Sequence, residues 1–166
     1  MATVFRNKRS KLPAAAIVFK HIAIPTDGSK LARKGVKAGM KLAQSLGAKV
    51  TGVYVIPPYT RPVYDEAALY YVPGMSPREY RKKCGSAAEK ALAEVETEAQ
   101  TAGVLCATRV VTSPQPYKGI LRAARAAKCD AIAMASHGRG AVAGVFLGSA
   151  TSHVLAYSKL PVLVTR

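Results

Sequence analysis

The sequence predicts an α/β fold with a five-stranded parallel open sheet, doubly wound by helices in a single domain. Strand-like and helix-like segments alternate four times along the chain, which implies right-handed crossovers and helices on both faces of the sheet. The strand-like segments are mostly apolar, as strands covered on both faces should be. A length of 166 residues, 49% of them apolar, suffices for one hydrophobic core without a disulfide or metal.

The first two strands flank an amphipathic helix. Residues Ile17–Ile24 are rich in β-branched and apolar side chains and end at the turn Pro25-Thr26-Asp27-Gly28. From Ser29 onward, apolar residues recur at helical spacing with basic residues between them, until Gly47 provides a stop. Lys49–Ile56 is the second strand, which two prolines end.

A long connection precedes the second helix. It runs from Pro57 to Met75 and contains four prolines and four tyrosines. Connections of this length in a compact domain are often lids or partner surfaces, and an apolar flap over the sheet edge is the alternative. Ser76-Pro77-Arg78-Glu79 is a capping box with proline at the first helical position, so a long helix is expected to begin there.

The remaining elements continue the same alternation. Their expected bounds are a strand at Cys106–Thr112, a helix at Tyr117–Lys128, a strand at Asp130–Ala135, a helix at Ser149–Lys159 and a strand at Pro161–Thr165. A glycine-rich loop joins the fourth strand to the last helix. These elements leave no room for a second domain.

Charge and cysteine content narrow the class of protein. The chain carries 25 Lys and Arg against 9 Asp and Glu, a net charge of +16. Five of the basic residues lie in the first twenty positions, so we expect residues 1–17 to be a basic flexible leader and 18–166 to be the domain. The three cysteines are an odd number without close pairing, which favours a reducing cytoplasm. No apolar run approaches the roughly 18 residues of a membrane-spanning helix, so a soluble protein is expected.

A ligand site is expected where the strand order of the doubly wound sheet reverses, outside the carboxyl ends of the strands. With five strands that point lies most simply between the first and the fourth, whose loops are Pro25–Ser29 and Ser136–Ser149. Asp27 offers acceptors for an adenine amino group or a ribose, and glycines of the second loop let a backbone approach a polyphosphate. Ser149 opens a helix whose N-terminus suits an anion. Taken singly each feature fits an ordinary turn or cap; their joint placement indicates a nucleotide site.

Several catalytic and phosphate-binding motifs are absent from the sequence. It contains no G-x-x-x-x-G-K-[ST] phosphate loop, no G-x-S-x-G nucleophile elbow, no H-E-x-x-H zinc motif and no Cys-x-x-Cys pair. Gly138–Ala143 fits a relaxed dinucleotide fingerprint, but no acidic residue follows Asp130 to hold a ribose. No general base stands beside an activated nucleophile, so we expect neither a catalytic residue nor a protein metal ligand.

The loop after the fourth strand carries a recognisable motif. Ala135-Ser136-His137-Gly138, then nine residues, then Gly148-Ser149, resembles the G-x2-G-x9-G-[ST] motif of nucleotide-binding universal stress proteins. The resemblance covers Phe19–Arg166, including the opening Ile-Pro-Thr-Asp-Gly-Ser and the closing Leu-Pro-Val-Leu-Val. It implies a Rossmann-like sandwich of the adenine nucleotide alpha hydrolase-like type. Ala135 replaces the motif's first glycine, and its methyl is expected to weaken or slightly shift nucleotide binding.

The resemblance implies ATP in the crevice, with a divalent cation, Mg²⁺ or Mn²⁺. Asp27 and the backbone of Val55 would meet the adenine, and Met134 to Gly138 would follow the ribose and phosphates. Arg139 is placed to pair with an anionic oxygen, or is an exposed loop arginine. The implied nucleotide-binding residues are Pro25, Thr26, Asp27, Ser29, Val55, Met134, Ala135, His137, Gly138, Arg139, Gly148, Ser149, Ala150 and Thr151.

These features predict an ATP-binding stress-response module that acts as a nucleotide sensor or slow ATPase. The resemblance also implies a homodimer formed through the last strand, Val162–Thr165, and an apolar edge strand favours pairing with its own copy. An alternative is a basic protein that binds nucleic acid or an anionic surface without ATP, as the charge of +16 suggests. A third is a nucleotide-independent scaffold whose tyrosine-rich segment near Tyr70 and Tyr71 meets a protein partner.

Overall fold

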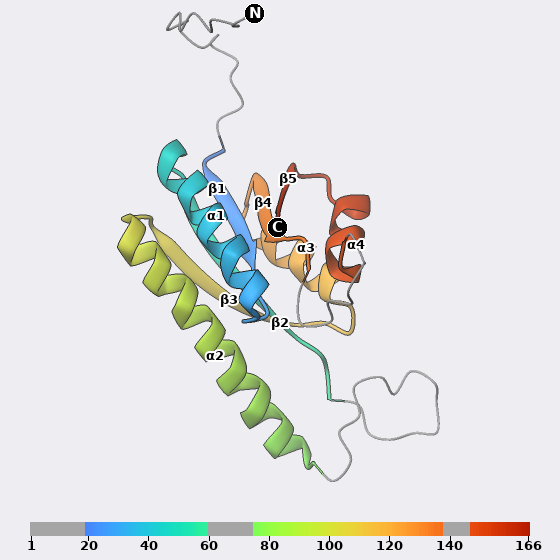
Figure 1. The fold of residues 1–166 in the computed structure, drawn as a ribbon. Coiled ribbons are helices and arrows are strands. Elements are labelled where there is room, and N and C mark those ends of the chain that lie inside the picture. The colour runs from blue at the N-terminus through green and yellow to red at the C-terminus, as the bar shows by residue number, and fades with distance from the viewer. Residues whose placement is uncertain (1–18, 60–74, 138–146) are drawn as a thin grey trace, which may run out of the picture.

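Five parallel strands form one sheet between two layers of helices (Figure 1). The computed structural model describes residues 19–59, 75–137 and 147–166. In sheet order the strands are β3 (Cys106–Thr112), β2 (Lys49–Ile56), β1 (His21–Pro25), β4 (Ala131–Ala135) and β5 (Val162–Thr165). The helices are α1 (Lys30–Leu46), α2 (Pro77–Ala102), α3 (Pro116–Ala126) and α4 (Ser149–Tyr157). The predicted doubly wound parallel fold is confirmed.

Alternate residues of the central strands face different helical layers. On β1, Ile22 and Ile24 are fully buried in a cluster with side chains of α1 and α2. Ala23, between them, belongs instead to the cluster formed with α3 and α4. Residues of β4 divide in the same way. Both faces of these strands are therefore covered, which explains their mostly apolar composition.

Glycines allow α1 to lie close to the sheet. A Cβ atom at Gly35 would lie only 2.7 Å from the backbone nitrogen of Ala135. At Gly39 it would lie 2.8 Å from Cδ1 of Ile24 and 3.0 Å from Cβ of Ala133. The lack of a side chain at Gly35 and Gly39 and the small alanines of β4 together allow this short separation.

Both helices of the α1–α2 layer begin where the sequence predicts, and α1 also ends at the predicted Gly47. The Ser29 hydroxyl accepts a hydrogen bond from the Ala32 amide and caps α1. Ser76 and Glu79 form the predicted capping box at the start of α2. Gly47 and Gly103 follow the two helices in the left-handed conformation, with φ of 62° and 64°. Local side-chain chemistry therefore fixes these helix ends.

Three expected bounds differ from the structure by two residues or more, and four others differ by one residue. The first strand begins at His21 and not at Ile17. Residues 17 and 18 lie outside the described residues. The third helix ends at Ala126, because Lys128 has a φ of 55° that ends the helical path. The last helix ends at Tyr157, because Ser158 is extended.

The basic leader, 1–17, and the segment containing Tyr70 and Tyr71 lie outside the described residues, so both interpretations stay predictions. Within the described part of the chain, no helix has the length and apolar character needed to cross a membrane.

Candidate functional site

The strand order reverses between β1 and β4, as the sequence predicts. From β1 the chain first builds β2 and β3 on one side, then crosses to build β4 and β5 on the other. The loops that leave the carboxyl ends of β1 and β4 therefore lead to opposite helical layers, one into α1 and the other into α4. We call the residues at this point the switch-point site: Pro25–Ser29, Ser136, His137 and Gly148–Thr151.

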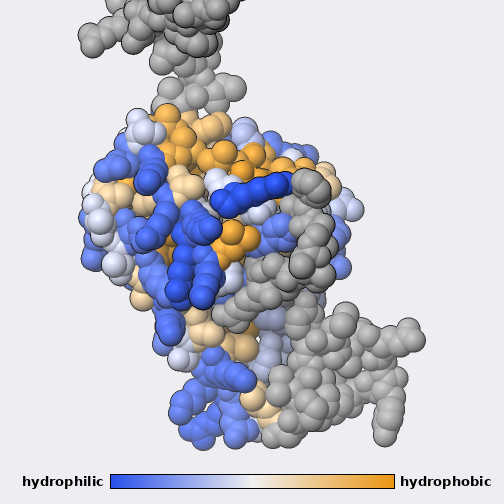
Figure 2. Space-filling model, in the orientation of Figure 1, coloured by the Kyte–Doolittle hydropathy of each residue, from blue (hydrophilic) through white to orange (hydrophobic). Residues whose placement is uncertain are grey.

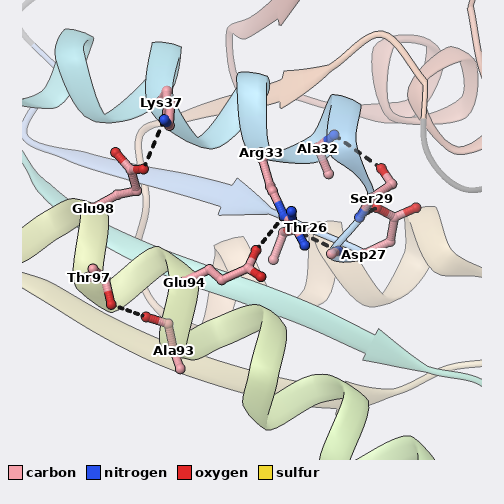
Figure 3. Close-up of polar contacts among 11 residues, drawn as sticks. Thr26, Asp27, Ser29, Ala32, Arg33, Lys37, Ala93, Glu94, Thr97 and Glu98 are labelled. Atoms are coloured by element: carbon pink, nitrogen blue, oxygen red, sulfur yellow. Dashed lines mark hydrogen bonds and ion pairs between the residues drawn. The ribbon is translucent and has the colours of Figure 1, made fainter.

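Hydrogen bonds hold the loop after β1 in one shape (Figure 3). The Thr26 amide donates to the Val53 carbonyl at 2.9 Å, and the Thr26 hydroxyl accepts from the Gly28 amide at 3.1 Å. The Asp27 carboxylate accepts from the Ser29 amide at 2.9 Å. Gly28 has a φ of 76°, where side chains are disfavoured. This turn fixes the partly exposed Asp27 at the carboxyl edge of the sheet.

Strand β2 continues past the end of β1. Pro25, the last residue of β1, is in register with Val53, so Val55 lies two residues further on. The side chain of Val55 packs below α3, where a Cβ at Gly119 would lie 2.8 Å from its Cγ1. The backbone of Val55 therefore extends beyond β1 beside the loop that carries Asp27.

The loop after β4 is closed at its base. The Gly148 amide donates to the Ser136 carbonyl at 2.8 Å. Thr151 is 2% exposed, and its hydroxyl donates to the Ala135 carbonyl at 3.0 Å. The Ser136 amide also donates to the Thr165 carbonyl of β5 at 2.7 Å. The first two bonds hold the start of α4 against the end of β4, and the third joins that end to β5.

The N-terminus of α4 lacks a side-chain cap. Its N-cap is Gly148, which has no side chain to accept a bond from the first-turn amides, and no acidic residue occupies the first turn. At α1 and α2, by contrast, serine hydroxyls cap the corresponding amides. An uncapped first turn offers backbone N–H donors and the positive end of the helix dipole to an anion.

The methyl of Ala135 faces α1. It lies 3.1 Å from the position of a Cβ built at Gly35, and Ala135 is 7% exposed. Residues Ala131 and Ala133 of β4, which have the same parity, belong to the cluster with α1. The extra methyl of the altered motif thus packs into the helix layer, where Gly35 accommodates it.

The other predicted site residues take different positions. The side chain of Met134 is buried with α3 and α4, so a ligand would meet its backbone. His137 is partly exposed, and its Nδ1 lies 3.0 Å from the buried Ser136 hydroxyl. Gly138 and Arg139 lie outside the described residues. Pro25, Thr26, Asp27 and Ser29 lie on the loop after β1, and Gly148, Ser149, Ala150 and Thr151 lie at the start of α4.

The structure gives two residues roles that the sequence interpretation did not assign to them. Ser136 is 1% exposed, and its backbone amide and carbonyl both hold the loop base. Gly35 makes room for Ala135. The four-residue spacing of Gly35 and Gly39 was the available signal, since it puts both on one helix face.

Two further observations concern metal ligands and cavities among the described residues. They contain no group of three or more His, Cys, Asp or Glu that could hold a metal ion. A hollow of about 420 Å³ lies at the opposite edge of the sheet, lined by residues that include Gln44, Lys49 and Leu105. That edge carries the amino ends of the strands, away from the switch point.

The doubly wound sheet, with its loop pair at the switch point, defines an α/β protein of the class that binds ligands at the carboxyl ends of its strands. The family model "Universal stress protein family" matches residues 19–166. The chain therefore belongs to the universal stress protein family.

Similarity to individual proteins extends over most of the chain. A universal stress protein of Thermus aquaticus, from the QAH/OAS sulfhydrylase 3' region, is 32% identical over 152 residues, which cover 90% of this chain and all of that protein. The structure of hypothetical protein MJ0577 is 26% identical, with a TM-score of 0.73 and coverage of 90% and 96%. A universal stress protein in complex with cAMP has 23% identity, a TM-score of 0.66 and coverage of 90% and 98%.

Proposed function

We propose that this universal stress protein binds ATP at the switch-point site and acts as a nucleotide sensor in a stress response. One observation carries the proposal: the fixed Asp27 turn and the uncapped N-terminus of α4 lie at the two loops of the strand reversal. The first offers a carboxylate acceptor, and the second offers amide donors. An adenine nucleotide has an amino donor at one end and anionic oxygens at the other. The cAMP complex of a relative with the same fold agrees with this class of ligand.

The adenine would lie beside Asp27 and the backbone of Val55, between walls formed by Pro25 and Thr26. The carboxylate would accept a hydrogen bond from the adenine amino group. Guanine carries a carbonyl oxygen at the equivalent ring position, which would meet the carboxylate as a second acceptor. We therefore expect preference for ATP over GTP.

The phosphates would lie at the start of α4. The amides of Ser149 and Ala150 would donate to phosphate oxygens, and the Ser149 hydroxyl is exposed beside them. Thr151 would contribute through its amide, because its hydroxyl is bonded to Ala135. Gly138 and Arg139 would complete the phosphate loop. Arg139 would pair with an anionic oxygen.

A divalent cation, Mg²⁺ or Mn²⁺, would accompany the nucleotide. Phosphate oxygens would supply most of its ligands, and the exposed Ser149 at the start of α4 offers a hydroxyl. The bound ion would neutralise phosphate charge, so this chain's own part is to position the nucleotide. The first turn of α4 itself contains no acidic residue that could serve as a general base. We therefore propose sensing as the main role, with hydrolysis slow at most.

We further propose that the protein works in the cytoplasm as a homodimer through β5, together with protein partners. Strand β5 lies at one end of the sheet and, among the described residues, pairs only with β4. Leu163 on this edge strand is 41% exposed. Pairing with a second copy would satisfy the outer backbone groups and cover this side chain.

Thermal unfolding with and without ATP and Mg²⁺ tests the nucleotide proposal. Ligand at about one hundred times its dissociation constant stabilises a fold by about 2.7 kcal/mol, which corresponds to a rise of roughly 5 to 10 °C in Tm. AMP and GTP serve as comparison ligands. Absence of any shift with ATP in the wild-type protein would overturn the proposal.

Ser149→Glu tests whether the phosphates lie at α4. A carboxylate at the first helical position favours the helix dipole, by about 0.3–1 kcal/mol, so the unliganded fold should be retained. The same charge repels phosphate, so the ATP-dependent shift should disappear. Ser152→Glu, an exposed position one turn later, is the matched control and should keep the shift. A full shift in Ser149→Glu would place the phosphates elsewhere.

A further inference from the structure

An exposed cluster of aromatic rings joins α3 to α4. The Tyr117 ring stacks on His153, with centroids 4.8 Å apart and planes 18° apart, and on Tyr157 at 5.3 Å and 23°. The His153 and Tyr157 planes differ by 6°. The Nδ1 atom of His153 donates to the Ser149 carbonyl at 2.6 Å, which fixes its ring. Tyr157 is 62% exposed, so aromatic surface remains open to a ligand.

Basic side chains line the outer surface of α3 beside this cluster. Lys118, Arg122 and Arg125 are exposed and follow the spacing i, i+4, i+7, which places them along one helix face. The Lys118 Nζ lies 5.9 Å from the centroid of the Tyr117 ring. The Arg122 guanidinium donates to the Thr112 carbonyl at 2.6 Å, which orients its remaining donors.

The positive charge of this surface has no acidic counterpart on the same two helices. From residue 99 to the end, the chain has eight Lys and Arg but a single acid, Asp130. Both carboxylate oxygens of Asp130 accept bonds from the backbone amides of Lys20 and His21, at the amino edge of the sheet. Nothing acidic in the α3 and α4 segments therefore offsets the three basic residues.

The opposite layer differs in this respect. Arg33 of α1 pairs with Glu94 of α2 at 2.7 Å, and Lys37 with Glu98 at 3.4 Å (Figure 3). Figure 2 shows hydrophilic side chains over much of this face, and these include both signs of charge. Basic residues also gather at the start of α2, but the tyrosine among them, Tyr80, is only 8% exposed.

We propose that the α3–α4 surface binds single-stranded nucleic acid. We define this surface as Tyr117, Lys118, Arg122, Arg125, His153 and Tyr157. Unpaired bases would stack on the aromatic cluster, and the backbone phosphates would pair with the basic row on α3. Aromatic platforms beside basic grooves are how sequence-tolerant single-strand binders work, because every base has a π-face. This surface is separate from the switch-point site, and nucleic acid can bind to it without ATP at the switch-point site.

Fluorescence anisotropy with the full chain and labelled oligouridine or oligothymidine of about 12 nucleotides, within the usual single-strand site size, tests the proposal. Tyr157→Ala should weaken binding roughly 5- to 100-fold, the usual effect of removing one stacking platform. Tyr157→Phe keeps the ring and should bind like the wild type. Thermal unfolding of each variant confirms that the fold is retained.

Charge reversal locates the phosphate contacts. The double variant Lys118→Glu/Arg125→Glu should reduce the slope of log K against log salt by about 1.4, since each single-strand phosphate contact contributes about 0.7. The double variant Lys82→Glu/Lys83→Glu on α2 makes the same change in net charge at exposed positions and should retain the slope. Equal effects of the two double variants would mean diffuse attraction to the whole protein and would overturn the proposal.

Duplexes of the same length and anionic phospholipid vesicles distinguish other ligands. Weaker binding to duplex than to single strand, together with loss of binding in Tyr157→Ala, supports stacking of unpaired bases. A preference for oligouridine or oligothymidine identifies RNA or DNA as the natural ligand. Binding to vesicles without binding to oligonucleotides would assign the surface to lipid headgroups instead. Equal binding of Tyr157→Ala and wild type would also refute the proposal.

Discussion

Replacing Gly35 by alanine should destabilise the fold, although alanine is the better helix former. Gly35 lies inside α1, where a Cβ would meet the backbone nitrogen of Ala135 at 2.7 Å and its Cα and Cβ at 3.1 Å. The nearest obstacle is backbone, which cannot rotate away as a flexible side chain can. The helix and β4 must therefore move apart.

The two opposing contributions can be compared. Overpacking a well-filled core costs about 1–3 kcal/mol, and the gain from replacing a helical glycine by alanine is about 0.5–1 kcal/mol. The midpoints of the two ranges leave a net loss of roughly 1 kcal/mol, and their extremes bound it between about 0 and 2.5 kcal/mol, so in a domain of this size Tm should fall by roughly 3 °C and by at most about 10 °C. Because β4 leads directly into Ser136, which holds the base of the phosphate loop, the ATP-dependent shift should decrease as well.

Thermal unfolding of two alanine variants provides the assay. Gly85 lies in the middle of α2, and a Cβ there would meet nothing within 4 Å. Gly85→Ala should therefore show the helix-propensity gain alone and raise Tm by roughly 1 to 4 °C. Adding Ala135→Gly to Gly35→Ala should restore little, since the backbone contact stays. A rise in Tm for Gly35→Ala equal to that for Gly85→Ala would refute the close approach of α1 to β4.

Three more predictions concern other buried or edge positions. Burial, with a smaller contribution from Lys49, lowers the pKa of His21 although Asp130 opposes it, so the fold favours the neutral ring. The contribution of His21 to stability should be complete above the unfolded pKa of about 6.5 and lost as pH falls below it. Urea unfolding between pH 7.5 and 5 should therefore show that the free energy of unfolding declines less steeply in His21→Gln than in the wild type. Thr151→Val removes the donor to the Ala135 carbonyl and should cost about 1–3 kcal/mol in thermal unfolding, whereas Thr97→Val, whose hydroxyl bonds at an exposed site, should cost far less. Leu163→Lys should shift the mass measured by sedimentation from dimer to monomer. Leu155→Lys alters an equally exposed leucine of α4 and should leave the dimer intact. A monomer mass for the wild type at all concentrations would contradict the β5 interface.

The parts of the fold that the sequence predicts well are those set by local chemistry. β2 and β3 have the bounds expected from the sequence, α1 begins directly after Ser29, and Ser76 caps α2 as predicted. The start of the first strand is predicted less well. Its apolar composition extends upstream, but pairing with β2 begins at His21, opposite Lys49. Where a strand starts depends on its neighbour, which composition does not show.

The site could be predicted in its location but not in its internal geometry. The alternation of elements places the two loops at the switch point, because parallel topology allows few arrangements. The direction of the Ala135 methyl depends on which helix covers which face of β4, and the motif alone carries no such information. The bonds from Gly148 and Thr151 to β4 join residues separated by the whole glycine-rich loop. Only the folded chain brings them together.

The distribution of charge separates the two proposed binding sites. The net charge of +16 predicts a general attraction to polyanions, to which the basic leader contributes. The ion pairs between α1 and α2 offset part of this charge. The α3–α4 surface instead keeps its positive charge beside the aromatic cluster. Ser149→Glu and Lys118→Glu/Arg125→Glu alter different helices, so their effects on ATP and on oligonucleotide should be independent. Loss of both ligands from either variant would mean that α4's first turn and α3's outer face form one continuous anion-binding surface.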